Sequence, residues 1–179
     1  MVPMTDHRGH NPWAYAAFVL GMLFALVSLY WTVGGTALLD TVGGSLEAAG
    51  RKRSAAVVVI LALTTAVKAG GAVFSLALVR PWGNRLPRRL LLWLGWIGTA
   101  VLIGYGGTLV AVQALVVAGV IDAPGADLVA LRWHLYLWDA WSLVWGVLLG
   151  LAVLRFSRQR PSRHQAGAEA DSTERAALP

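Results

Sequence analysis

Three residues of this sequence that could take part in acid–base chemistry lie within apolar surroundings. His134 and Asp139 belong to the stretch LRWHLYLWDAWSLVWG (residues 131–146), and Tyr105 belongs to GYGG (residues 104–107). An imidazole, a carboxyl group and a phenol that share a cavity are typical proton donors and acceptors of enzymes. These three are therefore the candidate catalytic residues. The alternative is that they hold helices together or lie at the water boundary.

Lys68 is a second charged residue inside an apolar run. A charge at the centre of a membrane span costs about 2.5–3.5 kcal/mol on insertion scales. At 1.5 Å per helical residue, Lys68 and Asp139 would differ in depth by only ~6 Å. We therefore predict that the two residues pair, with Thr64, Thr65 and Tyr105 supplying further hydrogen bonds. The competing interpretation pairs Asp139 with Arg132.

The residue types that bind metals and cofactors are scarce. Cysteine is absent, and only one of the four histidines, His134, lies in an apolar run. His7 and His10 share a polar tail and could hold at most a surface metal. The sequence contains neither a P-loop nor the H-E-x-x-H and G-x-S-x-G motifs. We expect neither a metal nor a cofactor.

Four long apolar stretches must position these residues. The chain is 57% hydrophobic and 13% charged, whereas soluble domains have about 25% charged residues. A bilayer core about 30 Å thick needs about 20 apolar residues per helix. The sequence therefore predicts an all-α, integral membrane four-helix bundle over residues 13–156, with spans at about 13–33, 55–79, 90–118 and 132–154. We expect a polar N-terminal tail (1–12) and a disordered C-terminal tail (157–179).

The cations indicate how the bundle is oriented. With the N-terminus inside, nine cations flank the inner ends of the spans: Arg8, Arg80, Arg85, Arg88, Arg89, Arg155, Arg158, Arg160 and Arg163. Four flank the outer ends: Arg51, Lys52, Arg53 and Arg132. Cytoplasmic loops are enriched in Lys and Arg, so both termini are predicted to be cytoplasmic. The net charge of +6 then fits the anionic cytoplasmic leaflet, and nucleic acid is not an expected partner.

Helical periodicity divides the predicted spans into faces. In the last span, an aromatic face is formed by His134, Trp138, Trp141 and Trp145, and a polar face lies roughly opposite, formed by Arg132, Tyr136 and Asp139. The tryptophans favour packing or lipid contact, and the alternative is a wall on which a ligand stacks. The first span has a face of small residues that predicts close helix approach: Ala14, Ala17, Gly21, Ala25 and Ser28. The second span has a polar face formed by Thr64, Thr65, Lys68, Gly71 and Ser75.

The connection between the first two spans contains VGG twice, at residues 33–35 and 42–44. Glycine pairs let the backbone turn sharply or pack closely. The segment is either a flexible outer loop or a cap over a cavity, and in the second case Asp40 and Glu47 lie at the cavity mouth. The predicted ligand-binding residues are Lys68, Asp139, Tyr105, Thr64, Trp138, Trp31 and Asp40.

Three separated stretches carry a resemblance to a known family: LVSLYWTVGGTALLDTVGGSLE, LVRPWGNRLPRRLL and LRWHLYLWDAWSLVWG. Together they resemble a family of small four-helix bacterial membrane proteins, domain of unknown function 3995, over about residues 13–156. In that family a proline commonly follows the aspartate of the last helix, whereas this chain has Ala140. The resemblance implies a fold and a membrane location, and it implies no activity.

The residues favour a binding module over an enzyme. We predict a multi-pass protein of the bacterial inner membrane with a polar pocket in its outer half that binds a small apolar or lipid-like ligand. The alternatives are an enzyme acting on a membrane-embedded lipid or isoprenoid, and a structural subunit of a membrane complex. The expected partners are membrane lipids, and a homo-oligomer is a further alternative.

Overall fold

The computed structural model describes residues 11–159, and within this range it contains only helices and connecting turns. Four helical stretches are long and apolar enough to cross a membrane. They are α1 (Pro12–Thr32), α3 (Ala55–Ala77), α4 (Arg88–Val117) and a continuous stretch made of α5 (Leu128–Trp133), η3 (His134–Trp138) and α6 (Asp139–Arg158). The prediction of an all-α chain with four long apolar helices is confirmed. His7, His10 and nearly all of the two predicted tails lie outside the described residues.

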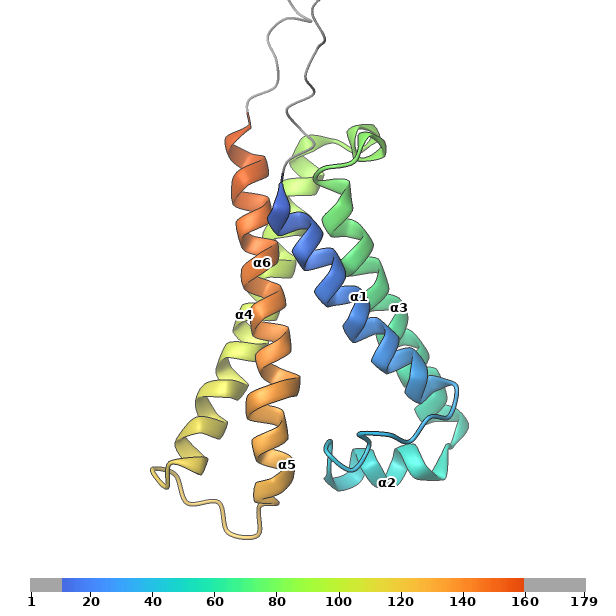
Figure 1. Cartoon of the computed structure of the whole chain (residues 1–179), viewed down its shortest axis with the longest axis vertical. Coiled ribbons are helices and arrows are strands. Elements are labelled where there is room, and N and C mark those ends of the chain that lie inside the picture. Colours follow the sequence, from blue (N-terminus) through green and yellow to red (C-terminus); the bar gives the residue numbers. More distant parts are fainter. Residues whose placement is uncertain (1–10, 160–179) are drawn as a thin grey trace, which may run out of the picture.

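The four long helices form two pairs. Helix α3 packs along α1, helix α4 packs along α6, and α1 also contacts α6, whereas α3 and α4 hardly touch each other. Figure 1 shows the pairs meeting at the end where α1 begins and α6 finishes, and diverging toward the opposite end, where the short helix α2 (Gly44–Lys52) lies. The arrangement leaves α3 and α4 apart.

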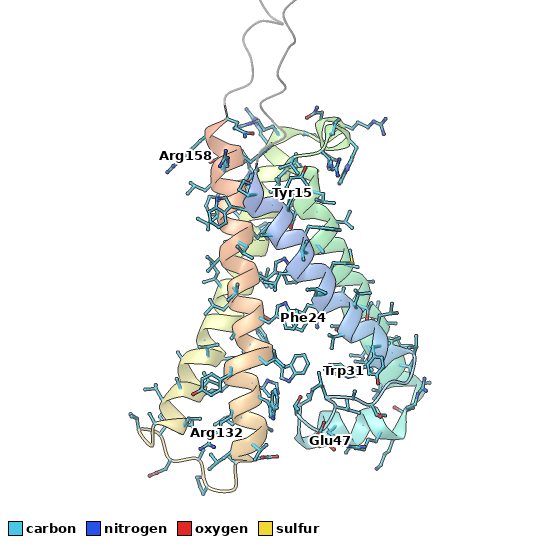
Figure 2. All side chains as sticks on the ribbon, in the orientation of Figure 1. Tyr15, Phe24, Trp31, Glu47, Arg132 and Arg158 are labelled. Atoms are coloured by element: carbon cyan, nitrogen blue, oxygen red, sulfur yellow. The ribbon has the colours of Figure 1, made fainter. Side chains whose placement is uncertain are left out.

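Polar side chains tie the helices together at the end where the pairs meet. The Asn11 amide donates to the Ala152 carbonyl at 3.0 Å, which joins the start of α1 to α6. The Arg88 guanidinium, at the start of α4, donates to the Ser157 carbonyl at 2.7 Å. The last carbonyls of a helix have no partner within it, so Arg88 satisfies a group that would otherwise need water. Figure 2 labels Tyr15 and Arg158 at this end and Glu47 and Arg132 at the other.

Small residues allow the helices of the bundle to approach closely. All five members of the small-residue face on α1 are buried: Ala14, Ala17, Gly21, Ala25 and Ser28. A Cβ atom at Gly21 would lie 2.5 Å from the Trp145 ring of α6. A Cβ atom at Gly106 of α4 would lie 2.7 Å from the Leu143 backbone nitrogen of α6. The predicted close approach at α1 is confirmed, and the contact at Gly106 is equally close, so neither position has room for a larger side chain.

The connection between α1 and α3 is more ordered than the sequence indicated. Residues 33–43 form turns, and α2 follows them. Helix α2 has Glu47 in its first turn and Arg51 in its last, as the helix dipole favours, and the two form an ion pair at 2.9 Å. In the preceding turns Leu39 and Thr41 are buried and Asp40 between them is exposed. The turns therefore pack on the bundle through two of their side chains.

Candidate functional site

A cavity of about 680 Å³ lies among the long helices. Ligand pockets in proteins have volumes of about 300–1,000 Å³. Six of the seven residues predicted to bind a ligand line this cavity: Trp31, Thr64, Lys68, Tyr105, Trp138 and Asp139. The candidate catalytic residue His134 lines it too. The seventh, Asp40, is exposed and is not part of the lining. The structure thus brings residues from α1, α3, α4, η3 and α6 to one place.

The mouth of the cavity lies between α3 and α4. The most exposed residues of the cavity lining come from these two helices: Val67 is 74%, Val101 61% and Tyr105 60% exposed. These two helices make few contacts with each other. The cavity therefore opens through the side of the bundle, between two helices.

Aromatic rings form much of the wall opposite the mouth. The Phe24 ring of α1 stacks on Trp141 with centroids 5.2 Å apart, and it also stacks on Trp138 at 6.4 Å. Phe24 points into the space between α1 and α6 (Figure 2). Trp145 is 4% exposed, and its ring fits against Gly21 and Gly71. The tryptophans therefore pack in the core, and Trp138 and Trp145 present part of their surface to the cavity.

Lys68 lies near the middle of α3 and has partners on α1 only. Its Nζ atom donates to the Ser28 hydroxyl at 2.8 Å and lies 3.5 Å from the centre of the Phe24 ring. Lys68 is 13 residues after the start of α3 and nine before its end, which corresponds to about 20 and 14 Å along the axis. A lysine stem cannot span those distances, so the ammonium group remains near the middle of the helix.

The predicted ion pair between Lys68 and Asp139 is wrong. Within residues 11–159, no carboxylate oxygen lies within 4.0 Å of the Lys68 Nζ atom. The Lys68 side chain points toward α1, where its ammonium group contacts Ser28 and Phe24. The alternative pairing of Asp139 with Arg132 is also wrong, because Arg132 is exposed and makes no ion pair with Asp139.

Asp139 instead joins two other side chains. Its Oδ2 atom accepts a hydrogen bond from the Gln113 amide of α4 at 2.7 Å and lies 3.1 Å from His134 Nδ1. The second ring nitrogen of His134, Nε2, lies 3.2 Å from the Val42 carbonyl oxygen in the turns before α2. Asp139 is 3% exposed and Gln113 8% exposed. A buried polar chain therefore links Gln113, Asp139, His134 and the backbone of Val42.

A π-helical turn makes the contact between His134 and Asp139 possible. Residues five apart on an α-helix point about 140° away from each other at 100° per residue. Residues His134–Trp138 form a π-helix, in which the Asp139 N–H bonds the His134 carbonyl. The wider turn places side chains five residues apart on the same side. The prediction that His134 and Asp139 lie on opposite faces is therefore wrong, because it assumed an unbroken α-helix.

The contacts of His134 place both of its ring nitrogens in a hydrogen-bonding network. Both ring nitrogens face oxygen acceptors, the Asp139 carboxyl group and the Val42 carbonyl. A neutral imidazole has one N–H. Both contacts are hydrogen bonds when His134 and Asp139 share one additional proton, either as imidazolium and carboxylate or as imidazole and carboxylic acid. In either form the pair is neutral overall.

The turns before α2 close the cavity at the end where the helix pairs diverge. The Trp138 indole donates to the Thr41 hydroxyl at 3.1 Å, and the Trp31 indole donates to the Ala37 carbonyl at 2.9 Å. Val42, held by His134, lines the cavity. The geometry of residues 33–43 is therefore that of a cap and not of a free loop.

Sequence reasoning missed three residues of this site. Ser28 and Phe24, which hold Lys68, had no signal, because both are ordinary members of an apolar helix. Gln113 had a usable signal, since it is an isolated amide inside the apolar run of α4. A buried amide needs hydrogen-bond partners, so its position could have predicted a polar contact with a neighbouring helix.

Comparison with protein families assigns the chain. The model of the family described as "Protein of unknown function (DUF3995)" matches residues 21–149. The chain belongs to this family. The resemblance seen in the three sequence stretches is confirmed, and the match to DUF3995 includes every residue that lines the cavity, from Phe24 to Leu149. No curated protein and no solved structure matches the chain.

Proposed function

We propose that this protein is a multi-pass protein of the bacterial inner membrane with both termini in the cytoplasm. Four helices have the length and apolarity to cross a bilayer. Large apolar side chains cover the outside of the bundle, such as Val67 on α3 and Trp93 on α4, each at least 70% exposed. In water such a surface would cause aggregation, whereas in a bilayer it is the ordinary lipid-facing surface. The excess of cations near the inner helix ends supports the orientation.

We propose further that the cavity binds a small apolar or lipid-like ligand. The observation that carries this proposal is the position of the mouth, between α3 and α4. In a bilayer that mouth faces acyl chains, so an apolar ligand can enter without crossing water. The lining is mostly apolar, and a few polar groups converge in it, among them Lys68, His134 and Asp139. This combination is typical of sites that bind small molecules.

Binding is favoured over catalysis by the state of His134. A general base needs a nitrogen within hydrogen-bond reach of the proton that it abstracts. Both ring nitrogens of His134 are already engaged, one by Asp139 and the other by Val42. An enzyme acting on a membrane-embedded substrate would have to break one of these contacts first. The structural-subunit alternative differs from both, because it requires no ligand in the cavity.

Mass spectrometry of co-purified lipids tests the binding proposal. Gly70 lines the cavity, and a Cβ atom there would meet nothing within 4 Å, so Gly70→Phe would place a ring in the mouth without displacing the backbone. Gly104 of α4 has equally open surroundings but does not line the cavity, so Gly104→Phe is the matched control. We expect the wild type and Gly104→Phe to retain the same apolar species, and Gly70→Phe to lose most of it. Equal retention by all three proteins, or none by the wild type, would reject the proposal.

A further inference from the structure

We infer that the ligand is an anionic amphiphile whose negatively charged head group pairs with Lys68 and whose apolar chain leaves through the opening between α3 and α4. This inference rests on the proposed binding function and names the chemical class of the ligand. It follows from three features of the cavity: the charge of Lys68, the unused donors that face the cavity, and the apolar lining near its mouth.

Lys68 contributes a positive charge to the cavity lining. The ionisable side chains of the lining are Lys68, Tyr105, His134 and Asp139. His134 and Asp139 hold each other and are neutral as a pair when they share a proton. The Lys68 ammonium has no carboxylate within 4.0 Å among the described residues. A cation without a counter-ion at this depth is a preferred place for an anion.

Lys68 also keeps a donor available for that anion. An ammonium group has three N–H donors. One of them goes to the Ser28 hydroxyl, and the Phe24 ring covers another side of the group. Both of these partners belong to α1, while Lys68 itself lines the cavity. A carboxylate or phosphate oxygen in the cavity can therefore pair with Lys68 without displacing any contact within the protein.

Tyr105 offers a second donor on the other side of the cavity. Its hydroxyl makes no hydrogen bond with any residue in the described part of the chain, and Tyr105 lines the cavity at the mouth. The Tyr105 hydroxyl can donate to an oxygen atom of a ligand in the cavity. The rest of the lining near the mouth is apolar and suits a hydrocarbon chain: Val67, Phe74, Leu94, Val101 and Leu102. An amphiphile with its head at Lys68 therefore has an apolar path to the bilayer.

The experiment uses photoactivatable lipids on the purified full chain in detergent micelles. The charged probe is a long-chain fatty acid with a diazirine in its chain, and the methyl ester of the same fatty acid is the uncharged control probe. Peptide mass spectrometry locates the labelled residues. We expect the fatty acid to label cavity-lining residues of α3 and α4 at a concentration about tenfold below that of the ester. A photoactivatable phosphatidylglycerol tests whether a phosphodiester serves as well as a carboxylate, and preference for either anion over the ester supports the inference.

Three variants assign the preference to Lys68. Lys68→Met should abolish the advantage of the charged probe, and Lys68→Arg, which keeps the charge, should preserve it. Lys52→Met is the matched control, because Lys52 is an exposed lysine on α2 that does not line the cavity, and it should behave like the wild type. If Lys68→Met does not fold, the two wild-type probes still decide whether an anion is preferred over the ester.

The outcomes separate the two levels of the proposal. Equal labelling of the cavity by the anionic probes and the ester would overturn the anionic head group and leave the binding cavity intact. An advantage of the charged probe that persists in Lys68→Met would also overturn the role of Lys68. Absence of cavity labelling by every probe would overturn the binding function itself.

Discussion

The Nδ1 atom of His134 lies 3.1 Å from the Oδ2 atom of Asp139, although the two residues are five positions apart on one helix. A π-helical turn produces this contact, and it has consequences beyond the helix. Asp139 also accepts a hydrogen bond from Gln113 on α4, and His134 also contacts the Val42 carbonyl in the cap. One irregular turn therefore connects a neighbouring helix and the cap to the wall of the cavity. Isolated π-turns are frequent at functional sites.

The link between Gln113 and Asp139 should contribute measurably to stability. In Asp139→Leu the Gln113 amide and the His134 ring each lose a buried partner. A buried polar group without a partner costs about 1–3 kcal/mol. We expect Gln113→Leu and Asp139→Leu each to lower the thermal midpoint in detergent, and the double variant to lower it by less than the two losses combined. Asp122→Leu, at an exposed aspartate, is the control, and strictly additive losses would mean that the bond contributes nothing.

Lys68 should be coupled energetically to Ser28 and not to Asp139. The Lys68 ammonium donates to the Ser28 hydroxyl, and the loss of a hydrogen bond to a charged group costs about 1.5–3 kcal/mol. We expect Ser28→Ala to destabilise the wild type and to have little effect in a Lys68→Met background. Lys68→Met and Asp139→Leu should have additive effects, because they share no partner. Thermal denaturation in detergent measures all of these effects, and strong coupling of Lys68 to Asp139 would contradict the geometry.

Two glycines of α4 should respond oppositely to the same substitution. A Cβ atom at Gly106 would lie 2.7 Å from the Leu143 nitrogen and 2.9 Å from the Asp139 carbonyl oxygen, whereas one at Gly104 would meet nothing within 4 Å. We expect Gly106→Ala to destabilise the bundle by about 1–3 kcal/mol, because the backbones must separate. Gly104→Ala should be neutral or stabilising by up to about 1 kcal/mol, because alanine has the higher helix propensity. Similar unfolding midpoints for the two variants would contradict this account.

The sequence predicted the four long helices and several polar residues of the cavity lining because both depend on simple patterns. Long apolar runs require helices, and a rare charge inside such a run must face the interior, which brought Lys68, His134 and Asp139 to the same region. The small residues of α1 predicted a close contact for a similar reason, since only they permit it.

The pairing within the cavity could not be predicted from the same patterns. The faces of the last helix were assigned at 100° per residue. The π-turn at His134–Trp138 rotates the residues before it, relative to those after it, away from the positions that this rule assigns. Lys68 was assigned to Asp139 by depth alone, and depth contains no information about direction around the helix. Lys68 contacts Ser28 because of the way α1 packs against α3, and the sequence does not specify this packing. Helix α2 was missed because a short helix with two glycines has a weak local preference for helix.

The proposed orientation can be tested with single cysteines, since the chain has none of its own. Asp122 lies in the turn between α4 and α5, and Arg85 lies in the short helix η2 (Pro81–Arg85) at the opposite end of the bundle; both are exposed. We expect Asp122→Cys to react with a membrane-impermeant maleimide in intact cells, and Arg85→Cys to react only after the membrane is permeabilised. The reverse pattern would place both termini outside. Reaction at both positions in intact cells would contradict membrane insertion.

The cap should open when its contacts with η3 are removed. His134 contacts the Val42 carbonyl and Trp138 donates to the Thr41 hydroxyl; next to these residues, Leu39 is 5% exposed and Asp40 is exposed. A cysteine at position 39 should therefore react slowly with a maleimide, and His134→Ala with Trp138→Phe should raise its rate by about tenfold, since each lost bond costs about 0.5–1.5 kcal/mol. A cysteine at position 40 reports general accessibility and should react rapidly in both backgrounds. An unchanged rate at position 39 would show that the hydrogen bonds do not hold the cap.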